Sequence, residues 1–288
     1  MLQVTDLSLA RSDGGGLLLS GISFTIAKGH IMGLCGFAGS GKTALVRCLT
    51  GLESGFSGEV RSEGGPVRLW QMPEGRDEDG TRRKAIDAAL KTQGAGCGAL
   101  VLDDPDAGLD PLEKRELLKG LRKLANDQGL PVLLVSSALG TLKAVCDDAA
   151  FLDAGELIEQ GEALRVLGMP LRLRTREFVE NSEGLGSFLQ LLHQGRLPGA
   201  GDDPVWELTF LGDCAGEALV AQLMVHFQVS ANIVYGSIDI IGGQIMGKLG
   251  VSLRGSPGNL LRAQNFLKVH GVEVTVRRGA IDSQQGQA

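Results

Sequence analysis

Gly36-Phe37-Ala38-Gly39-Ser40-Gly41-Lys42-Thr43 is the stretch that decides the fold, because it meets the pattern Gly-x-x-x-x-Gly-Lys-[Ser/Thr] in full. A short apolar strand, His30 to Leu34, precedes it, and a predicted helix from Lys42 to about Gly51 follows it. Glycines allow backbone N–H groups to turn inward toward phosphate oxygens, and the helix directs its positive dipole end at the same anion. The stretch therefore predicts a loop that binds the phosphates of a nucleoside triphosphate.

The side chains of this loop predict how the nucleotide and its metal are held. Lys42 is expected to reach the β- and γ-phosphates, and Thr43 is expected to ligate Mg²⁺. Asp103 ends an apolar strand over 99–103, where a carboxylate can help to hold the metal; the alternative is an ordinary aspartate at a strand-end turn. The residues predicted to bind ATP at the loop are Gly36, Gly39, Ser40, Gly41, Lys42, Thr43 and Ala44.

Composition restricts the classes of protein and partner. Apolar residues make up 43% of the 288 residues, which is ordinary for a chain that buries a core. The net charge is −6, and no run of Lys and Arg is longer than Arg82-Arg83-Lys84, so a nucleic-acid partner is not expected. The five cysteines form no Cys-x-x-Cys pair, which argues against a disulfide framework and against a zinc site.

Two features bear on membranes and export. Residues 1–6 contain no basic region followed by a long apolar run, so we expect no signal peptide. The longest uncharged stretch, residues 218–238, holds six polar side chains and is too polar to span a bilayer. Any role at a membrane is therefore expected to depend on a partner.

Hydrophobic periodicity predicts two domains. Strands and helices alternate over residues 1–193, which favours an α/β domain with a mainly parallel sheet. Glycines and prolines mark residues 194–204 as a linker. Residues 205–279 follow the order βαββαβ, with a hairpin at Gly242-Gly243, which predicts an α+β ferredoxin-like domain. Residues 280–288 are predicted to be a disordered tail.

Several motifs of the first domain resemble those of ABC transporter ATPases. The helix 42–49 is followed by Gly51-Leu52-Glu53 and Ser57-Gly58-Glu59-Val60, as in that family. Asp103-Asp104-Pro105 and Ala107-Gly108-Leu109-Asp110 resemble the Walker B motif and the D-loop, and Gly155 to Gly161 resembles the strand pair that follows. The resemblance places Gln71 in the glutamine loop, where it and Asp103 would support the metal and the attacking water.

The second domain narrows the resemblance to the methionine importer branch of that family. Those subunits carry a ferredoxin-like domain, called NIL, that binds the amino acid and restrains transport. Ala231-Asn232-Ile233 and Asp239 to Gly243 resemble it most. Asn232 would lie near the amino-acid site; an ordinary asparagine at a turn or strand start is an equal alternative.

The chain departs from the family at the catalytic positions. Only residues 72–102 separate Gln71 from Asp103, so the helical subdomain is shortened. Residues 76–80 read Arg-Asp-Glu-Asp-Gly where the family has its Leu-Ser-Gly-Gly-Gln signature, and such carboxylates would repel a γ-phosphate.

Asp104 stands in place of the catalytic glutamate as a base shorter by one methylene, and Ser137 stands in place of the switch histidine. No aromatic residue lies near Leu9-Ala10, where the family stacks one on adenine.

Three hypotheses follow. The first is the ATP-binding subunit of an ABC importer for methionine or a related amino acid, with impaired hydrolysis. It implies ATP and Mg²⁺ as cofactors, a membrane permease, a homodimer or a heterodimer with another ABC ATPase, and a cytoplasmic location at the inner face of the membrane. The second is a pseudo-ATPase that binds nucleotide and amino acid, acting as a regulator or as the silent half of a heterodimer. The third, a P-loop kinase, fits the Walker B and D-loop motifs less well.

Overall fold

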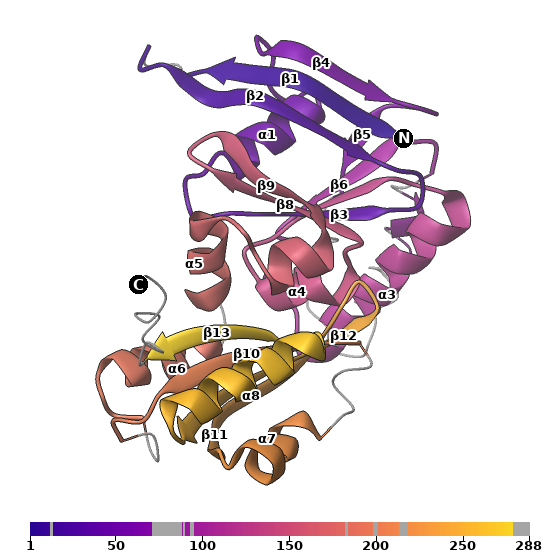
Figure 1. The fold of residues 1–288 in the computed structure, drawn as a ribbon. Coiled ribbons are helices and arrows are strands. Elements are labelled where there is room, and N and C mark those ends of the chain that lie inside the picture. The colour runs from indigo at the N-terminus through magenta and orange to yellow at the C-terminus, as the bar shows by residue number, and fades with distance from the viewer. Residues whose placement is uncertain are drawn as a thin grey trace. The chain divides into compact units, whose positions relative to one another are not determined.

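The computed structural model describes residues 1–11, 14–70, 88, 90–92, 95–181, 184–197, 201–212 and 218–278. The chain forms two compact units, Met1–Ser182 and Glu183–Ala288 (Figure 1). Gln71, the degenerate signature at residues 76–80 and the predicted tail at residues 280–288 lie outside the described residues. Their predicted roles therefore stay predictions.

The first unit is built on a six-stranded sheet in the order β5-β6-β7-β3-β8-β9. Adjacent strands are parallel except β8 and β9, which form an antiparallel hairpin. The mainly parallel sheet predicted from the sequence is confirmed. Its inner strands are buried throughout because helices cover both faces, which explains their continuous apolar runs. The strands are β3 Ile31–Cys35, β5 Val67–Leu69, β6 Ala99–Asp103, β7 Val132–Val135, β8 Asp148–Asp153 and β9 Glu156–Glu162.

A second, antiparallel sheet in the order β2-β1-β4 covers helix α1 from the other side (Figure 1). Its strands are β1 Leu2–Ala10, β2 Leu17–Ile26 and β4 Ser57–Ser62. Inward-facing Leu2, Leu7 and Ile22 are fully buried and belong to one core cluster with Leu45 and Leu49 of α1. The helix that follows the phosphate loop is thus held between two sheets, which fixes its direction.

The remaining helices of the first unit connect the strands. They are α1 Lys42–Leu49, α3 Pro111–Gln128, α4 Leu139–Val145, the π-helical turn η1 Leu164–Gly168, and α5 Leu173–Asn181. Helix α3 begins with a complete capping box, in which Asp110 accepts from the backbone of Glu113 and Glu113 accepts from the backbone of Asp110. Among the described residues, no helix has both the length and the apolar character needed to cross a membrane.

The second unit has the ferredoxin-like arrangement that the sequence predicts. Its strands pair antiparallel in the order β11-β12-β10-β13, with the first and last strands of the motif adjacent. Gly242 and Gly243 turn the hairpin with φ of 57° and 78°, as a two-residue turn with two left-handed positions requires. The elements are β10 Val205–Leu211, α7 Leu219–Phe227, β11 Ser230–Ile241, β12 Gln244–Arg254, α8 Pro257–Val269 and β13 Glu273–Arg278.

Helix α6, Gly184–His193, also belongs to the second unit. Its buried Leu185 and Phe188 form a cluster with Val205, and the Phe188 ring stacks on Tyr235 with centroids 5.1 Å apart. The sequence places this segment in the first domain, before the linker. Its amphipathic face instead packs on the side of the sheet that α7 and α8 leave uncovered, a contact that local periodicity does not reveal.

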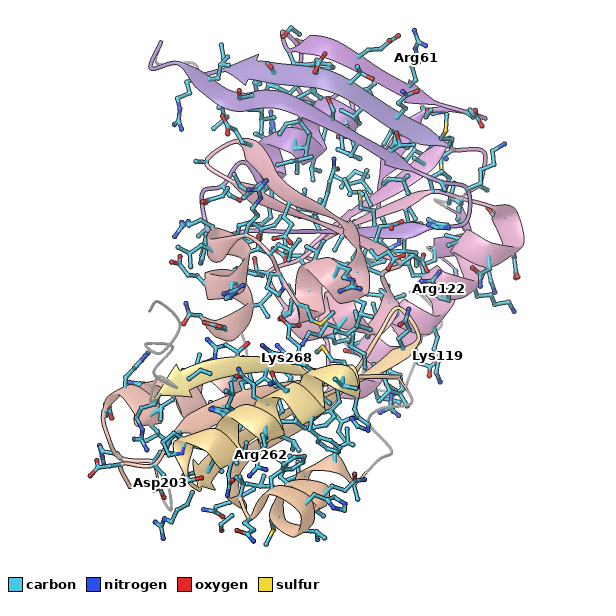
Figure 2. All side chains as sticks on the ribbon, in the orientation of Figure 1. Arg61, Lys119, Arg122, Asp203, Arg262 and Lys268 are labelled. Atoms are coloured by element: carbon cyan, nitrogen blue, oxygen red, sulfur yellow. The ribbon has the colours of Figure 1, made fainter. Side chains whose placement is uncertain are left out.

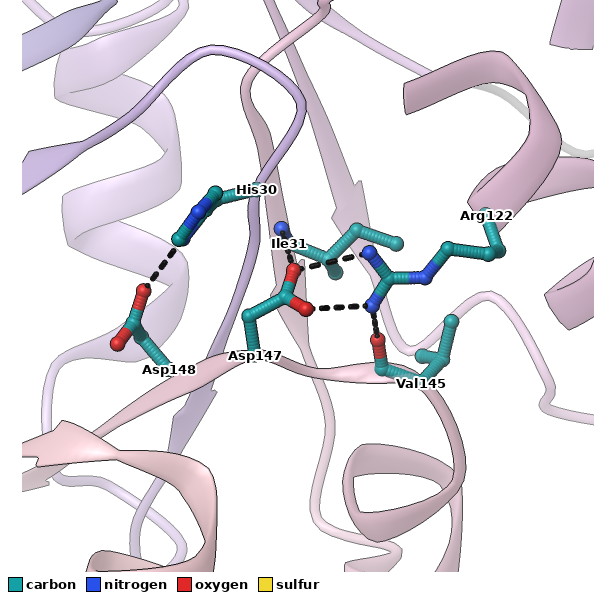
Figure 3. Close-up of polar contacts among 6 residues, drawn as sticks. All are labelled: His30, Ile31, Arg122, Val145, Asp147 and Asp148. Atoms are coloured by element: carbon teal, nitrogen blue, oxygen red, sulfur yellow. Dashed lines mark hydrogen bonds and ion pairs between the residues drawn. The ribbon is translucent and has the colours of Figure 1, made fainter. Parts of the chain in front are cut away.

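A polar clamp holds the amino ends of β3 and β8 (Figure 3). Arg122 of α3 binds both carboxylate oxygens of Asp147 at 3.0 Å and also donates to the carbonyl of Val145. Asp147 further accepts the N–H of Ile31 at 2.8 Å, while Asp148 pairs with His30 at 3.0 Å. Each of these two neighbouring carboxylates thus has a specific partner.

Candidate nucleotide-binding site

The loop of residues 36–41 joins the carboxyl end of buried β3 to α1. Gly36, Gly39 and Gly41 all have positive φ, of 156°, 77° and 106°. Gly36 has a second constraint, because a Cβ at this position would overlap the carbonyl oxygen of Leu152 in β8. The glycine pattern recognised in the sequence is therefore required both by backbone conformation and by close packing.

The β8–β9 hairpin braces the loop from outside. The N–H of Gly155, at the hairpin turn, donates to the carbonyl of Ser40 at 2.9 Å. The carbonyl of Gly155 in turn accepts the N–H of Ser20 in β2 at 2.9 Å. A Cβ on Gly41 would come within 2.9 Å of Leu19, also in β2. Two elements distant in sequence thus hold the path of the loop.

Lys42 crosses the loop and is held by two of its carbonyls. The ammonium donates to the oxygens of Gly36 at 2.7 Å and Phe37 at 2.9 Å. Because an ammonium has three donors, one remains for a phosphate oxygen. Burial lowers the pKa of Lys42, and the nearby charges of Asp104 and Asp103 partly oppose this effect. The lysine is thereby positioned before any ligand arrives.

Ser40 provides a test of whether the loop fits a triphosphate. Its hydroxyl is buried and has no hydrogen-bond partner among the described residues. An orphaned buried hydroxyl costs about 1–3 kcal/mol, so it calls for a functional or structural reason. A loop with an orphan hydroxyl, three left-handed glycines and a fixed ammonium suits a polyanion. ATP with Mg²⁺ fits this donor set: the loop and Lys42 would hold the phosphates, and the exposed Thr43 hydroxyl at the start of α1 could ligate the metal.

The parallel sheet brings Asp103 and Asp104 to the same edge as the loop. Asp103 ends β6, which pairs with β7, and β7 pairs with β3. Burial raises the pKa of Asp103, the charge of Asp104 raises it further, and Lys42 lowers it. Asp104 has φ of 42° and accepts the N–H of Ser137 at 3.1 Å. The structure thus places the predicted metal ligand and the predicted base beside the phosphate loop.

Asp106 is a connecting residue that the sequence did not single out. Its carboxylate, only 9% exposed, pairs with Lys114 of α3 at 2.8 Å. It also accepts from Thr141 of α4 at 2.5 Å and from Ser136, which follows β7, at 3.5 Å. Burial raises its pKa, but the hydrogen bonds and charge of Lys114 and Thr141 outweigh this and leave the pKa lowered. Asp106 therefore ties the predicted D-loop to the segment that carries Ser137.

Phe37, a variable position of the loop motif, anchors the loop on its other side. Its ring makes edge contacts with Phe151 of β8 and Phe178 of α5, with centroids 5.8 and 5.5 Å apart. The guanidinium of Arg174 lies 4.7 Å from the Phe37 centroid and pairs with Asp153 at 2.9 Å. Phe37 occurs in the quoted motif, but its partners could not be read from the sequence because they come from other elements.

The other predicted site residues are not part of this group. Ala44 is half-buried in the first turn of α1, whereas Gln71 lies outside the described residues. Asn232 belongs to the second unit, is exposed on β11, and lies opposite Ser252 of β12. Its predicted role in amino-acid binding is thus a separate question from the nucleotide site.

Comparisons with known proteins agree with this geometry. The family model "ABC transporter" matches residues 19–91, and the model "NIL domain" matches residues 204–276. The chain carries an ABC transporter domain followed by a NIL domain. Methionine import ATP-binding protein MetN of Protochlamydia amoebophila is 27% identical over 87% of this chain and 89% of its own length. The protein MetN 2 of Shouchella clausii is 24% identical over 90% of this chain and 92% of its own.

One further relative and one solved structure are also similar to this chain. MetN of Streptococcus pyogenes serotype M3 is 30% identical over 63% of this chain and 52% of its own length. A structure described as the ATP binding subunit of an ABC transporter superposes with a TM-score of 0.47 at 17% identity, covering 67% of this chain and 99% of that one. The chain is a homologue of the MetN proteins along most of its length.

Two alanine substitutions test the packing of the ABC transporter domain around the loop. Gly36→Ala and Gly39→Ala both place a side chain at positive φ, which costs about 1–2 kcal/mol. Only Gly36→Ala also creates an overlap with the backbone of Leu152, whereas a Cβ on Gly39 meets open space. In urea unfolding, the free energy of unfolding should therefore fall further for Gly36→Ala than for Gly39→Ala, by about 1–3 kcal/mol. Equal losses would contradict the close approach of β8 to the loop.

Asp106→Asn tests the carboxylate that joins the D-loop to α3 and α4. The folded-state pKa of Asp106 lies below its ordinary value of 3.8, so the ionised group stabilises the protein above that pH. This contribution is lost as the pH falls through the lower, folded-state pKa. At pH 7 the variant should be less stable by about 1–3 kcal/mol, since the Lys114 pair is broken.

The pH dependence separates this contribution from a packing defect. The difference in free energy of unfolding between wild type and Asp106→Asn should shrink as the pH is lowered below 3.8, because wild-type Asp106 then also becomes neutral. Asp127→Asn, at an exposed position near the end of α3, serves as the control and should change little. A difference that stays constant with pH would show that the charge of Asp106 does not matter.

Proposed function

We propose that this chain is the ATP-binding subunit of an ABC importer for methionine or a related amino acid, with impaired hydrolysis. The observation that carries the proposal is the phosphate loop with Lys42 fixed on its own carbonyls and Asp103 and Asp104 at the same sheet edge. The association of this site with a NIL domain, and the names of the relatives, support import of an amino acid.

The described residues are better suited to bind ATP than to hydrolyse it. Backbone N–H groups of the loop and the start of α1, together with Lys42, would hold the phosphates, and Thr43 and Asp103 would hold Mg²⁺, which neutralises phosphate charge when bound. Gln71 is expected to join them. Asp104 would orient the attacking water, but its carboxylate is short and already accepts the N–H of Ser137. A misplaced base typically lowers the rate by about 10²–10⁴.

The proposal also implies an assembly. An ABC ATP-binding subunit acts as a dimer on a membrane permease, so the chain would be a cytoplasmic protein attached to the inner face of the membrane through that permease. The subunit would form a homodimer or a heterodimer with another ABC ATPase. A degenerate signature at residues 76–80 would favour a heterodimer in which the partner subunit provides the intact one.

ATP turnover tests the proposal directly. Wild type should bind Mg·ATP but hydrolyse it at least about 10²-fold more slowly than an intact ABC ATPase assayed beside it. Asp104→Glu, which restores the missing methylene, should raise turnover, and Lys42→Ala in the same background should remove the gain. Wild-type turnover at the rate of the intact enzyme would contradict impaired hydrolysis. Failure to bind ATP at all would reject the whole proposal.

A pseudo-ATPase that senses an amino acid is the second candidate, and the tether between Asp104 and Ser137 favours it. Calorimetry with methionine tests it, and association with a permease separates it from the first. We expect methionine to bind the purified chain, Asn232→Ala to weaken binding, and Asn259→Ala, an asparagine elsewhere in the same unit, to leave it unchanged. Sensing alone would give methionine binding without permease association. No binding of methionine would exclude the sensor, whatever the result with ATP.

A further inference from the structure

A basic groove of about 690 Å³ runs along α3 and reaches the end of α4. Among the described residues that line it, five are cations and Asp127 is the one carboxylate. The chain as a whole has a net charge of −6, so this groove has the opposite sign to the protein that carries it. The five cations are Lys114, Arg115, Lys119, Arg122 and Lys123.

The cations form two rows with different environments. Lys114 and Arg122 are the inner row, and each is held by a carboxylate, at 2.8 Å by Asp106 and at 3.0 Å by Asp147. Their charges are thus largely balanced, and their positions are fixed. They shape the wall of the groove rather than supply free charge.

The outer row, Arg115, Lys119 and Lys123, is exposed. Arg115 and Lys123 make no ion pair with any residue that the structure describes, and Lys119 pairs only with exposed Glu116 at 3.3 Å. An exposed pair of this kind contributes about 0–1 kcal/mol and is easily exchanged. Figure 2 shows Lys119 and Arg122 on α3. The outer row therefore leaves positive charge available to a ligand.

The spacing of the outer row indicates the length and shape of that ligand. The three residues are four positions apart on a helix, which separates neighbours by about 6 Å along its axis and the ends by about 12 Å. Alternate side chains of an extended peptide are about 6.6 Å apart. An extended segment with acidic residues at alternate positions would thus meet all three cations at once, whereas a single phosphate would meet one.

We propose that this groove binds an extended acidic segment of a partner protein. Leu118 and Val145 lie among the lining residues and offer apolar contacts between the charges, which a peptide with apolar residues between its acids can use. The concave shape disfavours a flat lipid surface. The site is separate from the nucleotide loop and does not depend on ATP binding.

Fluorescence anisotropy with a defined probe tests this inference. The probe is a labelled ten-residue peptide of alternating Glu and Val, at about 0.15 M salt, where the Debye length is about 8 Å. Arg115→Glu/Lys119→Glu/Lys123→Glu should weaken binding by about tenfold or more. The matched control is Arg61→Glu/Arg262→Glu/Lys268→Glu, which makes the same charge change on β4 and α8 (Figure 2) and should stay within about twofold of wild type.

Other results would overturn the proposal. These are no binding to wild type, equal losses in both triple variants, or binding to the groove of single-stranded DNA, inorganic phosphate or anionic vesicles that is tighter than binding of the peptide. A peptide with the same composition but with its five glutamates in one block should bind more weakly than the alternating one; equal affinity would contradict the spacing argument. If the triple variant fails to fold, Lys123→Glu alone should still weaken binding relative to Lys268→Glu.

Discussion

The close approach of the loop after β3 to the backbone of β8 is the constraint on which the nucleotide site depends. Gly36 lies against the carbonyl of Leu152 with no room for a Cβ, and the hairpin turn at Gly155 binds the carbonyl of Ser40. These contacts fix the path of the loop, and the path fixes where Lys42 can place its ammonium. The cradle for phosphate is therefore a property of the folded sheet and not of the loop alone.

The carboxyl edge of the sheet organises the remaining chemistry. Parallel pairing of β6, β7 and β3 places Asp103 and Asp104 beside the loop, and Asp106 binds groups from α3, α4 and the segment after β7. Asp104 is held by the backbone of Ser137, so the residue expected to direct water is tied to the position where the family has its histidine. This arrangement is one reason for the proposal that the protein binds nucleotide and hydrolyses it slowly.

Structural features that depend on neighbouring residues could be predicted from the sequence. Features that depend on partners far away in the chain could not. The continuous apolar run predicted β6 to the residue, since a strand buried on both faces leaves little ambiguity. The phosphate loop and the Gly242-Gly243 hairpin were predicted because glycine at positive φ is a local requirement. Asp106, the Arg122 clamp and the place of α6 were missed, because their partners lie between 8 and 35 positions away or in another strand. The roles of Gln71 and Asn232 stay predictions.

The central claim is that the fixed Lys42 ammonium and the glycine loop form a working nucleotide site whatever the rate of hydrolysis. Equilibrium binding of Mg·ATP to wild type and to Lys42→Ala, with Lys28→Ala as an exposed-lysine control, tests it most directly. The account predicts saturable binding by wild type and by the control, and affinity lower by about tenfold or more for Lys42→Ala. Absence of binding by wild type, or equal affinity in Lys42→Ala, would contradict it.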